Sequence, residues 1–120
     1  DIYPMAYDVT CMHEFVMSLE GMKHDIDVSA LDVAKALLDR GIHPPTMYFP
    51  LIVHEALMVE PTETECKETL DHAIEAFRSI YEDAKNNPAK MHMMPMETPV
   101  KRLDEVRAAR TPVVKYEFEN

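Results

Sequence analysis

Four prolines interrupt the middle of the chain and restrict what can form there. They lie at positions 44, 45, 50 and 61 of the stretch HPPTMYFPLIVHEALMVEP, residues 43–61. Proline lacks a backbone N–H and disfavours a helical conformation in the residue before it, so this stretch cannot be one helix or one long central strand. Two short extended segments remain, at 46–49 and 56–60, and Pro50 restricts the first to a sheet edge or a bulge.

Two elements are predicted before this stretch. The segment CMHEFVMSLEG (11–21) alternates in hydropathy as a strand does, and we expect the side that carries His13 to face the core. The segment DIDVSALDVAKALLDRG (25–41) is typical of a helix, with Ser29 and Asp32 as a capping box. We expect the only two glycines, Gly21 and Gly41, in turns or helix caps, with Gly41 as the C′ residue of this helix.

The longest predicted helix follows Pro61. Thr62 and Glu65 have the spacing of a capping box, and Thr64 is an alternative cap. Beyond them apolar residues recur at steps of three and four until NNP at 86–88, where the helix should end.

The C-terminal third is predicted to be less regular. Residues 88–97 show neither a helix nor a strand period, so we expect a Met-rich loop there. Residues 98–110 predict a short helix with Thr98 as cap, Pro99 at its first position, and Leu103 and Val106 facing inward. The basic residues of this helix, Arg102 among them, alternate with acidic ones and are typical of a solvated face.

These elements predict one α+β domain over residues 1–120, with a lead-in at 1–10 and a short strand or extended tail at 111–120. We expect a small, mostly antiparallel sheet that helices cover on one face, so that the other face remains free to dock. Because the chain begins at Asp1 rather than at a methionine, we expect it to be part of a longer polypeptide.

Composition excludes several classes of partner. The formal net charge is −10, which disfavours nucleic acid and anionic membranes, because both select clustered lysine and arginine. The longest apolar run is too short to cross a membrane, and no secretory signal opens the chain. Cys11 and Cys66 lack a CxxC spacing, so we expect reduced thiols and a cytoplasmic location.

Some histidine and carboxylate residues are adjacent in the sequence and are candidates for catalytic or metal sites. His13 and Glu14, and likewise His54 and Glu55, are neighbours in segments predicted to be extended, where adjacent side chains point to opposite faces. Neither pair is therefore expected to form an acid/base couple or a metal site. His43 precedes two prolines in a rigid polar turn, which either presents a functional group or only satisfies the turn.

The segment KMHMMPM (90–96) allows two interpretations. Thioethers and an imidazole are suitable ligands for Cu(I), which would indicate a stand-alone, Met/His-rich, metal-responsive binding module. Methionine also serves as an adaptable packing residue in cores and at interfaces. The residues concerned are Met91, His92, Met93, Met94 and Met96.

Three blocks of the sequence resemble a known family. They are MHEFVMS (12–18), LDVAKALLDRGIHPPTMYFPLIVHEALMVEPTETECKETLD (31–71) and TPVKRLDEVRAAR (98–110). These blocks resemble consecutive parts of the C-terminal domain of glycine dehydrogenase (decarboxylating), the P-protein of the glycine cleavage system. The closest resemblance is to subunit 2 of the split bacterial form, and it spans residues 11–110.

The resemblance implies a fold and a reaction. The family belongs to the fold-type I enzymes that use pyridoxal phosphate, in which a large domain holds the cofactor and a small C-terminal domain closes over it. This chain would be the small domain. No His-Lys pair, which marks the Schiff-base lysine in the family, occurs here, so the isolated chain should be inactive.

In this family glycine is decarboxylated, and its aminomethyl group passes to the lipoyl arm of the H-protein. The implied partners are subunit 1, the lipoylated H-protein and the chain's own N-terminal large domain. The isolated fragment would self-associate through its free sheet face.

The resemblance also implies candidate site residues. The turn HPPT and the segment EPTETE would approach the active-site side of the domain, which makes His43, Thr46, Glu60 and Thr62 candidates for substrate-side or inter-domain lining. The family usually carries serine where Cys66 stands.

One further alternative is the small domain of another fold-type I enzyme, an aminotransferase or a decarboxylase. Such a domain would need an arginine placed for the substrate carboxylate. Arg40, at a helix end, and Arg78, within a helix, are poorly positioned for that role.

Overall fold

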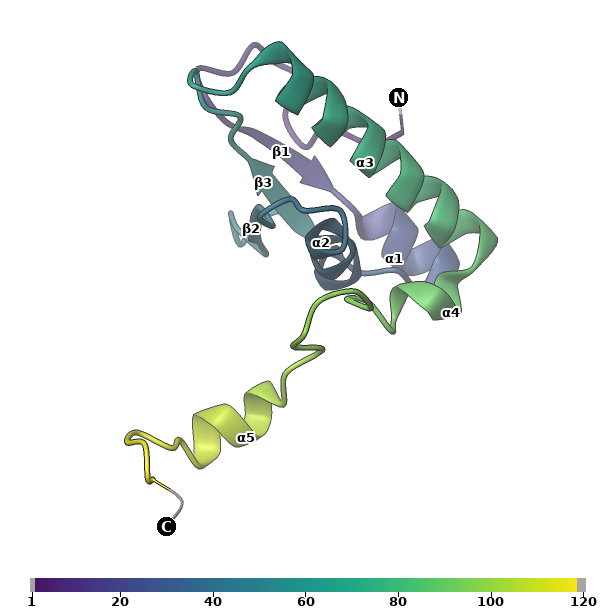
Figure 1. The fold of residues 1–120 in the computed structure, drawn as a ribbon. Coiled ribbons are helices and arrows are strands. Elements are labelled where there is room, and N and C mark those ends of the chain that lie inside the picture. The colour runs from purple at the N-terminus through teal and green to yellow at the C-terminus, as the bar shows by residue number, and fades with distance from the viewer. Residues whose placement is uncertain (1, 119–120) are drawn as a thin grey trace.

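The structure is a computed structural model that describes residues 2–118 and shows an α+β domain, as predicted. Helices pack on one face of a small sheet, and a C-terminal segment extends away from it (Figure 1). The elements in chain order are β1 (Phe15–Ser18), α1 (Glu20–Ile26), α2 (Ala30–Leu38), β2 (Thr46–Met47), β3 (Ala56–Val59), α3 (Lys67–Asn86), α4 (Pro88–Met91) and α5 (Glu105–Arg110).

The sheet is antiparallel, with the strand order β1-β3-β2. Strand β2 ends shortly before Pro50 and lies at an edge, as the proline predicted. Met17 of β1 pairs with Leu57 of β3, and both are buried on the face that the helices cover. The predicted lead-in also takes part, because Met5 forms an antiparallel bridge with Met17 beside the outer edge of β1.

The first strand is shorter than predicted. Strand β1 covers only residues 15–18, and Gly21 lies inside helix α1 rather than in a turn or cap. The pairing with β3 ends at Ser18 and Ala56, so the backbone beyond needs other hydrogen-bond partners. A helix supplies them and buries Met22 one turn after the buried Leu19.

Helix α2 has the predicted ends. The side chains and backbones of Ser29 and Asp32 form the capping box. Gly41 has a φ of 71° and donates to Leu38 O, while Ile42 donates to Leu37 O, both at 3.0 Å. These two bonds and the left-handed glycine form the C-terminal motif that the sequence predicted.

The predicted start of α3 is wrong. The hydroxyls of Thr62 and Thr64 bond to each other at 2.9 Å, and Glu65 N–H donates to Thr62 O in a turn, so no capping box forms there. The helix begins at Lys67 with Cys66 as N-cap, whose side chain makes no capping hydrogen bond. Its end at Asn86, before Pro88, agrees with the prediction.

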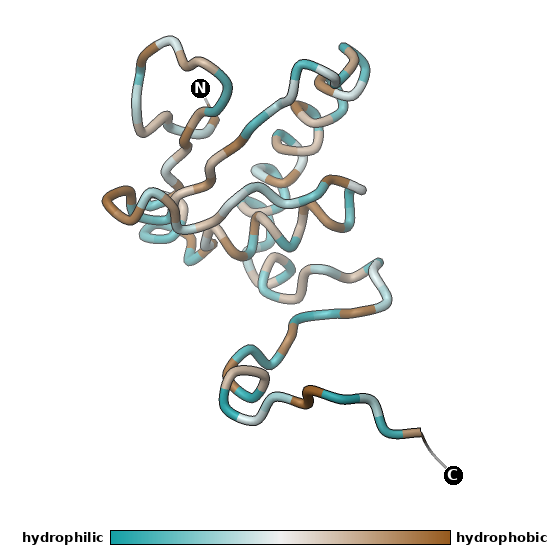
Figure 2. Tube along the Cα trace, turned by 90° about the vertical axis from the view of Figure 1, so that its left-hand side faces the viewer, coloured by the Kyte–Doolittle hydropathy of each residue, from teal (hydrophilic) through white to brown (hydrophobic). Residues whose placement is uncertain are grey.

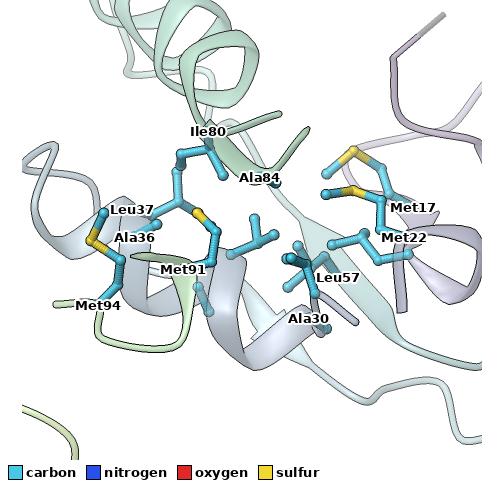
Figure 3. Close-up of a cluster of buried hydrophobic side chains, with 14 of the residues drawn as sticks. Met17, Met22, Ala30, Ala36, Leu37, Leu57, Ile80, Ala84, Met91 and Met94 are labelled. Atoms are coloured by element: carbon cyan, nitrogen blue, oxygen red, sulfur yellow. The ribbon is translucent and has the colours of Figure 1, made fainter. Parts of the chain in front are cut away.

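The Met-rich segment 88–97 is not simply the predicted loop. It opens with helix α4, and Met91 and Met94 are buried between α2 and α3, where Leu37 and Ile80 also lie (Figure 3). Met93 and Met96 of the same segment remain exposed. Because two of its methionines fill the domain core, the segment has a packing role.

The C-terminal helix also departs from the prediction. Asp104 caps α5 by accepting from Arg107 N–H at 2.9 Å, so Thr98 and Pro99 do not start it. Leu103 and Val106, expected to face inward, are each 61% exposed. They are exposed because Arg102 makes the last hydrogen bonds to the domain. From Leu103 onward the chain extends away from the domain (Figure 1).

Candidate functional site

A groove of about 500 Å³ lies between the end of the sheet and the first half of α3. Its walls are the turn after α2, the end of β3 with the residues that follow, and one face of α3. Its lining comprises Glu14, residues 41–46, residues 58–61, Glu65, Thr69, Leu70, His72, Ala73 and Phe77.

The groove brings together three of the four candidate residues. His43, Thr46 and Glu60 line it, although they are spread over 18 residues of sequence. Thr62 does not belong to the lining, and its hydroxyl is paired with that of Thr64. Strand β2 pairs with β3, and Thr46 lies opposite Met58. This pairing brings the turn that carries His43 and the end of β3, which carries Glu60, to the same groove.

The orientation of His43 follows from its neighbour. Its Nδ1 lies 3.0 Å from the carbonyl oxygen of Pro44. A carbonyl oxygen only accepts hydrogen bonds, so Nδ1 carries the proton in this contact. Nε2 is then the ring nitrogen that can meet a ligand.

The lining of the groove is mostly apolar, and its ionisable residues are carboxylates and histidines. Glu14, Glu60 and Glu65 contribute carboxylates, and neither lysine nor arginine is among the described residues that line it. His72 donates from Nε2 to Arg40 O at 3.1 Å and so ties α3 to the turn. This lining suits an amine or a neutral group and opposes a phosphate.

One acid/base expectation was wrong. His13 Nε2 lies 2.9 Å from Glu14 Oε2, whereas the predicted strand would have sent the two side chains to opposite faces. Strand β1 begins only at Phe15, so the alternation does not reach this pair. Both side chains are largely exposed, and Glu14 also lines the groove.

Arg40 has a structural role beside the groove. Its guanidinium donates to Ala36 O at 3.1 Å, to Ser79 Oγ at 3.0 Å and to Asp83 Oδ2 at 2.8 Å. These bonds join α2 to α3. The guanidinium is therefore engaged and is not presented to a substrate carboxylate.

A second hollow, of about 390 Å³, lies on the sheet face that points away from the helices. Val16 and Met58 form its base, because they alternate with the core residues Met17 and Leu57 along their strands. Residues of the lead-in and of the loop after β2 surround it, including the exposed apolar residues Tyr7, Val9, Met12 and Phe49.

Two residues that the sequence did not single out join distant parts of the domain. Arg102, predicted on a solvated face, donates to the buried Asp32 and to the carbonyl oxygens of Met91 and Met94. Glu55 accepts from Ala30 N–H at 2.6 Å and supports the start of α2. The sequence carried no signal for the first contact, because Asp32 already had a predicted partner in the capping box with Ser29.

A family profile described as "Glycine dehydrogenase, C-terminal domain" matches residues 1–102. The chain belongs to this family. The probable glycine dehydrogenase (decarboxylating) subunit 2 of Treponema denticola is 58% identical over 114 residues, which are 95% of this chain and 24% of that protein. The protein of the same name from Thermosipho melanesiensis is 55% identical over 98% of this chain, and that from Listeria innocua is 52% identical over 99%.

This member of the glycine dehydrogenase family spans about a quarter of the length of the curated relatives it matches. Across the described residues 2–118, no helix is both long and apolar enough to cross a membrane.

Proposed function

We propose that this chain is the C-terminal small domain of a glycine dehydrogenase (decarboxylating) subunit 2 and forms one wall of its active site. The observation that carries the proposal is the family match over residues 1–102, together with relatives of that name at up to 58% identity. The whole protein would decarboxylate glycine with pyridoxal phosphate in the cytoplasm. It would transfer the aminomethyl group to the lipoyl arm of an H-protein.

The lining of the groove does not fit the cofactor itself. A pyridoxal phosphate site needs cationic or N–H donors for the phosphate, and the groove offers three carboxylates instead. We therefore assign the cofactor and its lysine to the preceding large domain. The isolated small domain would be inactive, and subunit 1 would be a partner because the relatives are named subunit 2.

Within this proposal the groove faces the large domain. His43, Thr46 and Glu60 would line the substrate side, where the carboxylates of the lining would attract the amino group of glycine or of its aminomethyl product. Thr62, on the turn beside the groove, would make an inter-domain contact. The paired prolines hold His43 in place without the flexibility of a glycine-rich loop.

The test uses the full-length subunit 2 with subunit 1, H-protein and pyridoxal phosphate. We expect a cofactor absorbance band that shifts when glycine is added. In His43→Ala and Glu60→Gln variants, we expect glycine-dependent CO₂ release to fall about tenfold or more, roughly the effect of one lost hydrogen bond to the reacting group.

The matched controls are His24→Ala and Glu82→Gln, which alter exposed residues outside the groove. Both should retain full activity. Absence of a cofactor band in the assembled protein would contradict the proposed function. A normal band with fully active His43 and Glu60 variants would contradict only the role of the groove.

The free sheet face predicts the behaviour of the isolated chain. Phe49, Leu51 and Ile52 expose apolar surface beside the second hollow, and such a surface favours association. We expect sedimentation of residues 1–120 to show concentration-dependent oligomers. A monomer at high concentration would count against a docking role for this face.

A further inference from the structure

Residues 103–118, here called the C-terminal arm, make no described hydrogen bond to the rest of the domain. The bonds within it are local, such as Thr111 N–H to Arg107 O at 2.8 Å. Helix α5 has no buried residue, and Figure 1 shows it with the tail apart from the body of the domain. The arm thus contributes nothing to the core that residues 3–95 form.

The segment just before the arm is tightly held. Asp39 accepts from the N–H groups of Met96 and Glu97, at 2.5 and 2.9 Å. The Lys101 ammonium donates to the carbonyl oxygens of Met96 and Thr98, and Arg102 donates to Asp32. The point at which the arm leaves the domain is therefore fixed, although no hydrogen bond of the described residues holds the arm itself.

The tail of the arm has the pattern of a strand with one apolar side. Val114, Tyr116 and Phe118 alternate with Lys115 and Glu117. The two rings meet edge to face with centroids 5.0 Å apart, and Lys115 Nζ lies 3.7 Å from Glu117 Oε1. The backbone bends at Lys115 in this structure. In a straight strand the alternation would place the two aromatic rings on one side and Lys115 with Glu117 on the other.

The apolar residues of the tail are exposed to solvent. Val114, Tyr116 and Phe118 are between 77% and 89% exposed, and the neighbouring Val113 is 91% exposed. Figure 2 shows apolar segments spread along the whole extension, among polar ones. Apolar residues gathered at this density on an exposed segment mark an interaction surface.

The charge of the arm permits burial. Asp104, Glu105 and Glu117 are balanced by Arg107, Arg110 and Lys115, so the arm is neutral within a chain whose net charge is −10. Docking would therefore not bring a net charge into an interface. The unpaired backbone of the tail needs hydrogen-bond partners once it is buried, and the edge of a sheet supplies them.

We propose that the arm docks onto the part of the same polypeptide that precedes this chain, with residues 113–118 pairing as a strand at the edge of a sheet there. This inference rests on the proposed function, in which a large domain precedes the small one. The arm would act as a clasp that holds the two domains together.

Two observations favour this partner. Curated relatives align over as many as 119 of the 120 residues, so the alignment includes the arm, and these relatives are about four times as long as this chain. A docking surface in the same polypeptide is also present at a high effective concentration, of the order of millimolar. A separate molecule would need a correspondingly higher affinity for the arm to compete with it.

The test is amide hydrogen exchange on full-length subunit 2, measured by mass spectrometry at several protein concentrations, with and without subunit 1. We expect the amides of residues 113–118 to exchange at least tenfold more slowly than in an unstructured peptide of the same sequence. This protection should be present without subunit 1 and independent of concentration.

A pair of variants on opposite sides of the tail sharpens the test. The double variant Tyr116→Ser with Phe118→Ser should lose the protection, whereas Lys115→Ser with Glu117→Ser should keep it. The amides of α3 in the same spectra report whether the domain is folded. Since the arm lies outside the core, they should be unchanged in both variants.

Three outcomes would overturn the proposal. Protection only with subunit 1 present would show that the arm docks on the partner subunit, and protection that rises with concentration would show a second copy. Exchange at the peptide rate under all conditions would show that the arm does not dock. None of these results depends on cofactor binding or activity, so they are separate from a failure of the proposed function.

Discussion

Arg102 donates from Nη2 to Oδ1 of Asp32 at 2.5 Å, across 70 residues of sequence. Asp32 is buried, and its other oxygen accepts from Ser29 N–H at 2.9 Å and from the Ser29 hydroxyl at 2.6 Å. Arg102 also donates to the carbonyl oxygens of Met91 and Met94. One guanidinium therefore fastens the end of the domain to the first turn of α2 and to the Met-rich segment.

We predict that Arg102→Ala lowers the free energy of unfolding by about 2–4 kcal/mol, because it leaves a buried carboxylate without its cationic partner and two carbonyl oxygens without a donor. Urea unfolding of residues 1–120 measures the change. Arg107→Ala, on exposed α5, is the control and should change the value by less than about 0.5 kcal/mol. Equal effects of the two substitutions would contradict the anchoring role.

The same carboxylate should make stability depend on pH. Burial raises the pKa of Asp32, but hydrogen bonds from Ser29 and Arg102 outweigh it and hold that pKa below its usual value. A lowered folded-state pKa contributes stability above the unfolded pKa of about 3.9, and this contribution is lost as the pH falls through the folded pKa. The excess stability of the wild type over Asp32→Asn should therefore be constant above about pH 5 and shrink below about pH 4.

Denaturant unfolding of both proteins between pH 2.5 and 7 provides the measurement. His92 Nδ1 lies 3.5 Å from Asp32 Oδ2, so the comparison is repeated in a His92→Gln background. A stability difference that stays flat into the acid range would show that Asp32 does not hold this charge in the folded state.

Methionines within one short segment should differ sharply in their effect on stability. Met91 and Met94 are buried in the core, so Met91→Ala should cost about 2–4 kcal/mol, whereas Met91→Leu should cost less than about 1.5 kcal/mol. Met93→Ala should have almost no effect, because that side chain is exposed. Thermal unfolding of the three variants tests this, and a large loss in Met93→Ala would mean that the segment packs differently.

Cys66 is a poor residue for its position. It is the N-cap of α3, with φ −77° and ψ 163°, yet its side chain makes no capping hydrogen bond. Serine at this backbone conformation accepts from the N–H of the second or third helical residue, so Cys66→Ser should stabilise the chain by about 0.5–1 kcal/mol. Cys66→Ala separates the loss of the thiol from the gain of the cap and should bring no stabilisation in urea unfolding.

Features that depend on neighbouring residues were predicted well. The capping box of Ser29 and Asp32, the left-handed Gly41 and the edge position of β2 all follow from local backbone chemistry. The rigid turn that carries His43 was predicted for the same reason, because two consecutive prolines follow that residue.

The wrong predictions share a different cause. Thr62 has the spacing of a cap, but its hydroxyl bonds to that of Thr64. Strand β1, predicted to include His13, begins only at Phe15, opposite the last residue of its partner strand β3. Leu103 has the character of a core residue but lies beyond the last anchor of the domain. In each case the hydrogen bonds and contacts that the folded chain makes, or lacks, overrode a valid local pattern.

The sequence by itself determined the class of fold, the positions of most helices and strands, and the family, because hydrophobic period, proline and capping residues act over a few positions. Tertiary structure alone decided that Arg102 meets Asp32, that Met91 fills the core while Met93 does not, and that His43 and Glu60 share one groove. Such contacts depend on how the whole chain packs in three dimensions, and the spacing of residues in the sequence does not reveal them.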